Sequence, residues 1–390
     1  MTRKTSPTFE DALTQLVGAP SISSTQTEID MGNKPVIDLL ANWLENQGFD
    51  VSLQDINDKG DKQNLYATIG GSAVGGDSGG LVFSGHTDTV PCDPSLWDGQ
   101  PFQLKETMQG YQGLGATDMK GFFAVLLQSL AGIDLNKLQK PLVIVATADE
   151  ETSMSGARML LQERIANCEA VVIGEPTDLQ PIRMHKGIMM ESIRVQGKGG
   201  HSSDPALGIN AMEVMHEVLA GLLRLRAELQ KQYQHPGFAV SVPTLNPGCI
   251  HGGDNPNRIC SHCEIEFDLR TLPGMLNELM KSQIDAMIEP IAIKWDCAIA
   301  RTTLLQGIDS FEQDAQSRLI TLSEQFTDKA SSAVSFATEA PFYKKMGLET
   351  VVMGPGSIDQ AHAINEYIPG NQIKPATQIY DSLINSYCLG

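Results

Sequence analysis

The stretch GGLVFSGHTDTVP, residues 79–91, has the form of a buried strand that ends in polar residues. Three more apolar runs have this form, and each ends in acidic residues, glycine or histidine. They are PLVIVATADEETSMSGA (141–157), EAVVIGEPTD (169–178) and GLETVVMGPGSIDQAHAINEY (347–367). Such continuous runs are typical of strands buried on both faces, and helical periodicity occurs elsewhere, as at 8–18 and 34–47. The pattern predicts an α/β domain with a mixed, mostly parallel sheet and helices on both faces.

The middle of the chain has a different order of elements. Its predicted elements are a strand at 187–198, a helix at 207–229, strands at 238–245 and 258–272, a helix at 274–291 and a strand at 292–302. This β-α-β-β-α-β order is the split βαβ pattern of ferredoxin-like domains. We therefore predict that an α+β domain, residues 184–304, is inserted into an α/β domain formed by residues 1–183 and 305–390.

Composition and charge exclude several classes of partner. The formal net charge is −19, so the surface lacks the clustered Lys and Arg that nucleic acids or anionic membranes require. No apolar run approaches the roughly 18 residues of a membrane span, and residues 1–17 do not resemble a signal peptide. Seven scattered cysteines fit a reducing compartment. The sequence thus predicts a cytoplasmic protein with a small-molecule ligand.

Cys260 and Cys263 have the spacing of zinc ligands, but no second pair follows them. Their surroundings, NRICSHCEIEFDLR, alternate as a strand. The favoured interpretation is a structural pair in a strand, and a metal site is the alternative.

Acidic and histidine side chains follow the predicted strands. They are His86, Glu150, Glu151, Glu175 and His362, together with Asp118, which lies in GLGATDMKGFFAVLL (113–127) between glycines and a predicted helix. The carboxyl ends of parallel strands meet at one edge of a sheet, where ligands bind in open α/β folds. Several carboxylates gathered there repel one another, and Lys120 is almost the only cation nearby in sequence. One or two divalent cations are the simplest compensation.

Two pairs within this set suggest different roles. His86 and Asp88 face the same way on an extended strand, so Asp88 can orient the imidazole; an unrelated capping aspartate is the alternative. Glu150 and Glu151 are adjacent and their side chains diverge. One can bind metal while the other acts as general base toward the attacking water. The alternative is an acidic first helical turn without a catalytic role.

The motifs SGHTDTVP, GATDMKG, ADEETSMSGA, GEPTDL, GKGGHSSDP and GPGSIDQAHAINEYI resemble, in this order, those of the dinuclear zinc aminoacylase and peptidase family. This family includes carboxypeptidase G2-like enzymes and succinyl-diaminopimelate desuccinylase. The resemblance implies that His86 and Glu175 hold one Zn²⁺ and that Glu151 and His362 hold the other. It implies that Asp118 bridges both ions, that Glu150 is the base and that Asp88 orients His86. Co²⁺ or Mn²⁺ are possible substitutes.

The resemblance also assigns roles in the predicted inserted domain. It implies that this domain forms a homodimer and acts as a lid, and that His201 reaches the partner's site to stabilise the oxyanion. A histidine that caps the following helix is the alternative for His201. Asn257 and Arg270 match positions that bind the substrate carboxylate, and Arg258 is a further candidate; an exposed arginine without this role is the alternative for both arginines.

Two stretches narrow the expected activity. Residues 250–275 and 336–343 are most similar to family members that remove the acetyl group from N2-acetyl-L-ornithine. We therefore expect an amidohydrolase with this substrate. The alternatives are a related N-acyl amino acid deacylase, a desuccinylase or a dipeptidase. A non-catalytic metal-binding protein is a further alternative, but such a protein would not need the free base Glu150.

Overall fold

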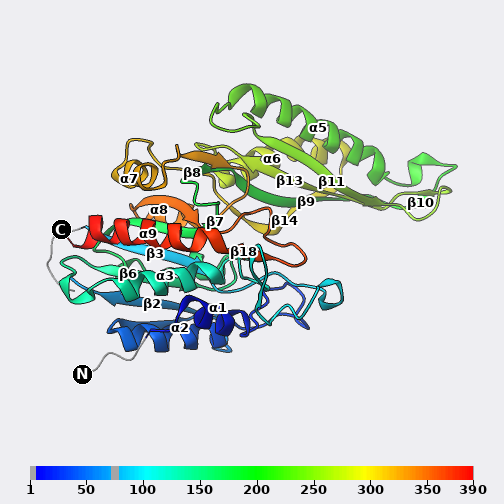
Figure 1. Cartoon of the computed structure of the whole chain (residues 1–390). Helices are drawn as coiled ribbons and strands as arrows, with labels where there is room; N and C mark the ends of the chain where they lie inside the picture. Colours follow the sequence, from blue (N-terminus) through cyan, green and yellow to red (C-terminus); the bar gives the residue numbers. More distant parts are fainter. Residues whose placement is uncertain (1–5, 72–78, 390) are drawn as a thin grey trace. The chain divides into compact units, whose positions relative to one another are not determined.

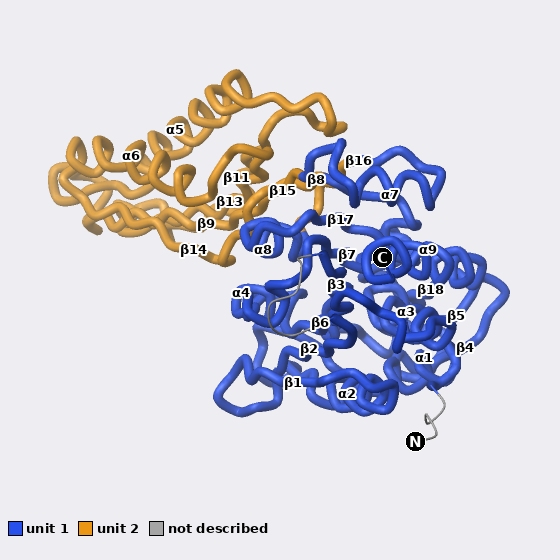
Figure 2. Tube along the Cα trace, turned by 90° about the vertical axis from the view of Figure 1, so that its left-hand side faces the viewer, with its two compact units in different colours: residues 1–183, 313–332, 338–390 blue, residues 184–312, 333–337 orange. Residues whose placement is uncertain are grey.

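The computed structural model describes residues 6–71 and 79–389. The prediction that residues 1–17 are not a signal peptide falls partly outside this range, because it includes residues 1–5. Contacts divide the described chain into two compact units (Figure 2). Unit 1 takes the described residues of 1–183, 313–332 and 338–390, and unit 2 takes 184–312 and 333–337. Among the described residues, no helix has both the length and the apolar character of a membrane span.

Unit 1 is built on a mixed sheet in which neighbouring strands follow the order β1–β2–β6–β3–β7–β17–β8 (Figure 2; β2, β6, β3, β7 and β8 are also labelled in Figure 1). Their bounds are β1 Asp50–Asp55, β2 Gln63–Ile69, β3 Gly80–His86, β6 Leu142–Thr147, β7 Cys168–Pro176, β8 Ile182–His185 and β17 Glu349–Gly354. The central strands β6, β3, β7 and β17 are parallel, whereas β1, β2 and β8 pair in antiparallel fashion toward the edges. β3 and β6 are buried along their whole length, as their apolar runs predict.

Helices cover both faces of this sheet. They are α1 Phe9–Val17, α2 Lys34–Gln47, α3 Lys120–Gly132, α4 Ser155–Arg158, α7 Arg318–Thr327, α8 Ala340–Lys345 and α9 Gly370–Cys388. Figure 2 shows α4 and α8 on one side of the strands and α1, α3 and α9 on the other. The predicted mixed α/β architecture is thus confirmed. α3 lies deepest, because its side chains are buried on nearly all sides, and it packs against α1 and α9.

A small antiparallel sheet lies beside the main one in unit 1. Its order is β18–β5–β4, with bounds β4 Lys105–Glu106, β5 Gly110–Gln112 and β18 Tyr367–Pro369. β5 leads through a glycine-rich turn into α3, and β18 leads directly into α9. The pairing of β5 with β18 therefore joins two segments that are distant in sequence.

Unit 2 contains a four-stranded antiparallel sheet in the order β11–β13–β9–β14. The elements are β9 Gly187–Gln196, α5 Ala211–Gln232, β11 Thr244–Gly252, β13 His262–Thr271, α6 Asn277–Trp295 and β14 Ala298–Ile308. This is the β-α-β-β-α-β order that the sequence predicts. Alternate residues of β13 are buried in a core that α5 and α6 share with the sheet, which explains the alternation of its sequence. β10 Gly200–His201 and β12 Arg258–Ile259 form a separate short ribbon.

Two strands in unit 2 are clearly shifted from their predicted positions. A strand was predicted at 238–245, but β11 spans Thr244–Gly252. β11 is an edge strand, mostly exposed, and its register shifts between Pro247 and Cys249. An exposed edge strand tolerates Pro and Gly and needs few apolar side chains. This strand therefore lacks the apolar pattern on which the prediction relied. Similarly, α6 continues to Trp295, and β14 begins only at Ala298.

Candidate metal centre

Three neighbouring parallel strands end at the same edge of the sheet in unit 1. His86 is the last residue of β3 and lies opposite Thr147, the last residue of β6. Glu175 is the penultimate residue of β7, which pairs with β3 on its other side. The side chains that follow these strands therefore gather in one place, as parallel pairing requires.

Two glycines allow α3 to lie directly on these strand ends. Gly85 precedes His86, and a Cβ there would come 2.4 Å from the Met119 side chain. Gly174 precedes Glu175, and a Cβ there would come 2.1 Å from the ring of Phe122. Each ligand candidate on β3 and β7 thus follows a residue whose missing side chain makes room for α3. This close approach brings the turn before α3, which carries Asp118, to the strand ends.

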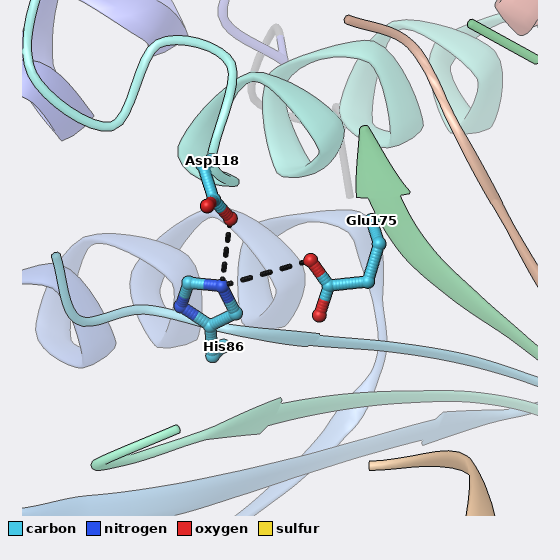
Figure 3. Close-up of side chains that lie close together, drawn as sticks. All are labelled: His86, Asp118 and Glu175. Carbon is cyan, nitrogen blue, oxygen red and sulfur yellow. Dashed lines mark hydrogen bonds and ion pairs between the residues drawn. The ribbon is translucent and has the colours of Figure 1, made fainter. Parts of the chain in front are cut away.

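The first cluster consists of His86, Asp118 and Glu175, all buried (Figure 3). His86 Nε2 lies 3.0 Å from Asp118 Oδ1 and 3.9 Å from Glu175 Oε2. One potential ligand atom from each of the three residues lies within 4.8 Å of the others, as a single metal ion requires. Glu175 Oε1 is buried without a hydrogen-bond partner in the described part of the chain. A buried carboxylate oxygen without a hydrogen-bond partner is suited to bind a cation.

The second cluster consists of Asp118, Glu151 and His362. His362 Nε2 lies 3.1 Å from Glu151 Oε2 and 3.5 Å from Asp118 Oδ2. His362 has a left-handed backbone, with φ of +58°, in the loop between β17 and β18. Asp118 is the only residue common to the two clusters, and its two oxygens face different histidines.

The electrostatics of the two clusters favour bound cations. Burial alone would raise the pKa of Asp118, but hydrogen bonds to His362 and His86 hold it below its usual value. Burial raises the pKa of Glu175 to about 8, against the opposing charge of His86. In His362, hydrogen bonds to Asp118 and Glu151 raise the pKa to about 10. In the metal-free protein, bound protons thus offset part of the negative charge of the carboxylates. The nitrogen and oxygen donors of the two clusters suit a divalent metal ion, which would displace these protons on binding.

Glu150 belongs to neither cluster found among the described residues. Its backbone N–H donates to Asp88 Oδ1 at 3.2 Å, and that of Glu151 donates to Asp88 Oδ2 at 3.1 Å. The carboxylate of Asp88 therefore holds the turn that carries both glutamates. Burial and the charge of Glu175 raise the pKa of Glu150 well above its usual value.

Asp88 contacts His86 chiefly through its main chain. Its carbonyl oxygen lies 3.1 Å from His86 Nδ1, whereas its carboxylate lies 3.6 Å away. Asp88 therefore contacts His86 and also accepts the N–H groups of Glu150 and Glu151, and its orienting role stays a prediction.

The remaining candidates lie in unit 2. His201 pairs with Arg258 in the β10–β12 ribbon, and its Nδ1 lies 2.7 Å from Ser203 Oγ. The carbonyl of Asn257 accepts the N–H of Ser202 at 3.1 Å, so His201, Asn257 and Arg258 occupy one ribbon. Arg258 is exposed and pairs with an aspartate four residues before it.

Arg270 lies near the end of β13 and donates to Asp268 at 3.0 Å. Cys260 and Cys263 are buried, free cysteines in the core of unit 2, and neither belongs to a metal cluster found among the described residues. Their packing in this core supports the interpretation that the two cysteines are structural.

Two buried acids near the clusters had no role in the sequence interpretation. Glu339 is fully buried just before α8, and its Oε1 accepts the hydroxyl of Thr147 at 2.6 Å. Glu366 is also buried, and its carboxylate accepts three main-chain N–H groups, including that of Asp118. Glu339 lies in the stretch 336–343 and Glu366 in the motif GPGSIDQAHAINEYI, but an acid in a loop gives no sequence signal of burial.

Comparisons with known proteins agree with this geometry. The sequence profile of peptidase family M20/M25/M40 matches residues 82–386. The chain is 42% identical over 383 residues to the acetylornithine deacetylase of Photorhabdus laumondii and 42% identical over 382 residues to that of Klebsiella pneumoniae, covering 98% of this chain and of each relative. Among solved structures, aminopeptidase PepT from Bacillus cereus has a TM-score of 0.75 at 17% identity, with 97% of this chain and 98% of that chain covered. The YXEP protein of Bacillus subtilis, described as a dinuclear metal-binding peptidase from the M20 family, has a TM-score of 0.67 at 14% identity, with 96% of both chains covered. With a profile match over most of its length and relatives of this identity, the chain belongs to the M20/M25/M40 peptidase family.

Proposed function

We propose that this protein is a metal-dependent amidohydrolase that removes the acetyl group from N2-acetyl-L-ornithine, giving acetate and L-ornithine for arginine biosynthesis. The observation that carries this proposal is the 42% identity to two acetylornithine deacetylases over 98% of both chains. Identity of this extent covers unit 1 with its clusters and also unit 2, where the candidate substrate-binding residues lie.

Two Zn²⁺ ions per subunit are the proposed cofactors, with Co²⁺ or Mn²⁺ as possible substitutes. His86 and Glu175 would hold one ion, Glu151 and His362 the other, and Asp118 would hold both. When bound, such ions polarise a carbonyl group and lower the pKa of a water molecule to about 7.

The chain supplies the acid–base chemistry through Glu150. Its carboxylate interacts electrostatically with Glu175, His86 and Glu151 but belongs to neither cluster found among the described residues, so it is free to take a proton from the attacking water. We propose that Glu150 then gives the proton to the leaving nitrogen, and that His201 donates a hydrogen bond to the oxyanion.

We further propose that unit 2 forms a homodimer and closes over the site as a lid, with Asn257, Arg258 and Arg270 as candidates for binding the substrate carboxylate. The seven free cysteines support the proposal of a cytoplasmic protein, because a reducing compartment keeps thiols unpaired.

A hydrolysis panel tests the proposed activity. The zinc-loaded protein should hydrolyse N2-acetyl-L-ornithine with a higher kcat/KM than N-acetyl-L-methionine or N-succinyl-diaminopimelate. A preference for acetylmethionine would indicate a general aminoacylase, and a preference for the succinyl compound a desuccinylase. No turnover of any N-acyl amino acid with two ions bound would contradict the proposal as a whole.

A further inference from the structure

Glu366 is a buried carboxylate that contacts the main chain of Asp118 but belongs to neither metal cluster found among the described residues. Its Oε1 accepts the N–H groups of Thr117 and Asp118 at 2.8 and 3.0 Å. Its Oε2 accepts the N–H of Gly115 at 2.8 Å. The turn before α3 thus directs three main-chain donors at one side chain, and both carboxylate oxygens are used.

The main chain around Glu366 holds the same turn. The carbonyl of Glu366 accepts the N–H of Gly113 at 2.9 Å, and the carbonyl of Tyr367 accepts the hydroxyl of Thr117 at 3.0 Å. β18 then pairs with β5, placing Tyr367 opposite Gln112. The segment that leads into α3 and the segment that follows His362 are therefore bonded along their length.

This arrangement has a consequence for both clusters. Asp118 directs one oxygen toward His86 and the other toward His362, so its contacts with both histidines depend on the orientation of one carboxylate. The three N–H groups bound to Glu366 come from the turn that ends at Asp118, and Glu366 lies four residues after His362. A single buried carboxylate thus fixes the spacing between the shared ligand and the loop of the second histidine.

We propose that Glu366 is the positioning residue of the shared ligand, holding Asp118 so that its carboxylate faces both metal ions. The inference rests on the proposed dinuclear site, but it concerns metal binding and not the choice of substrate. The proposal distinguishes Glu366 from a residue that binds only one ion. Loss of Glu366 should weaken both metal sites together, whereas loss of such a ligand should weaken mainly one.

The test is Zn²⁺ titration of the metal-free protein against a competing chelator. In Glu366→Gln one carboxylate oxygen becomes an NH₂ group, so at least one of the three N–H donors faces another donor. We expect the affinity of both sites to fall together by about 10- to 100-fold, as for other residues that orient metal ligands. Glu175→Gln and Glu151→Gln should each weaken mainly one site.

Glu339→Gln is the matched control. It makes the same substitution in an equally buried acid whose partner is the hydroxyl of Thr147, not the turn before α3. This variant should keep two bound ions. Wild-type affinity at both sites in Glu366→Gln, or weakening of one site alone, would overturn the positioning role, as would a wild type that binds only one ion.

Amide hydrogen exchange gives a second measurement that does not depend on the folding of a variant. In the metal-free wild type the N–H groups of Thr117 and Asp118 should exchange slowly, because Glu366 accepts both. If Glu366→Gln does not fold, Glu366→Asp, which keeps the carboxyl group but shortens the side chain, should show faster exchange at these amides and weaker binding at both sites. Fast exchange in the wild type, or unchanged binding in the aspartate variant, contradicts the proposal. A protein that binds two ions yet hydrolyses no acetylornithine would refute only the proposed function.

Discussion

The acids of this site differ in what holds them. Glu175 and Glu151 direct oxygens at histidines, whereas Asp88 uses its carboxylate to hold the main chain of two other residues. Glu150 is held by its backbone and leaves its side chain outside both clusters. The turn thus brings the Glu151 side chain into the second cluster and leaves that of Glu150 outside both, as the proposed ligand and base in adjacent positions would require.

The division between these two glutamates gives a direct test. Glu150→Gln should keep both ions and lose on the order of 10²-fold or more in kcat, the usual contribution of a general base. Glu151→Gln should instead lose the ion that it shares with His362. Metal content and steady-state kinetics of the two variants, measured side by side, decide the assignment. Loss of metal from the Glu150 variant with retention in the Glu151 variant would mean that the roles are reversed.

Glu339 shows how a buried acid links stability to pH. Burial raises its pKa from 4.5 to about 7, so the folded metal-free protein binds a proton that the unfolded chain has released. A group of this kind stabilises the fold below its unfolded pKa, and that contribution is lost as pH rises through the folded pKa. Between pH 4.5 and about 7 the wild type should lose stability relative to Glu339→Gln, which has no acidic proton, by on the order of 3 kcal/mol.

Urea unfolding of both metal-free proteins at about pH 5 and about pH 8 measures this difference. The amide should also preserve the contact with Thr147, because its carbonyl oxygen can accept the hydroxyl as Glu339 Oε1 does. A difference in the free energy of unfolding that does not change with pH would show that Glu339 keeps the same charge in the folded and unfolded states.

At the scale of elements, the close packing of α3 on the strand ends forms the site. The glycines before His86 and Glu175 leave no side chain between the strands and the helix, and Phe122 fills the space beside Gly174. Since Phe122 is fully buried, it has no room to move away from an added methyl group.

Gly174→Ala should therefore destabilise the protein by about 1–3 kcal/mol through overpacking, and it should weaken metal binding because α3 carries Asp118 at its start. Gly132→Ala is the control, because Gly132 ends the same helix and a Cβ there meets nothing within 4 Å. This control should unfold at the same urea concentration as the wild type or slightly above it. Equal stability and metal affinity in the two variants would contradict the view that α3 rests directly on β7.

The elements that could be predicted from the sequence are those whose pattern of apolar residues reflects their burial. The runs around 81–86 and 142–147 are buried on both faces and were recognisable as parallel strands, and the acids after them were recognisable because parallel strands end together. β11 was misplaced because an exposed edge strand with Pro247 has no such pattern. Glu366 was missed because its burial depends on the pairing of β18 with β5, which links segments about 250 residues apart and leaves no local periodicity.

At the scale of the whole molecule, the proposed catalytic residues are divided between two units. The metal clusters and Glu150 lie in unit 1, whereas His201 and the candidate substrate-binding residues lie in unit 2. His201 is exposed, and one of its ring nitrogens lies 2.7 Å from Ser203 Oγ. A two-unit enzyme of this kind can complete its site within one chain or across a dimer.

Subunit exchange distinguishes these two possibilities. Glu150→Ala and His201→Ala should each be inactive, because one lacks the base and the other a donor to the oxyanion. If His201 acts on the partner's site, a mixed dimer has one site with both residues intact and one site lacking both. Random exchange makes about half of the dimers mixed, so roughly a quarter of all sites should become active. If His201 acts within its own chain, every site lacks one residue and the mixture stays inactive. An inactive mixture, with exchange verified by native mass spectrometry, would therefore place the complete site within a single chain and leave the roles of Glu150 and the metal ligands unchanged.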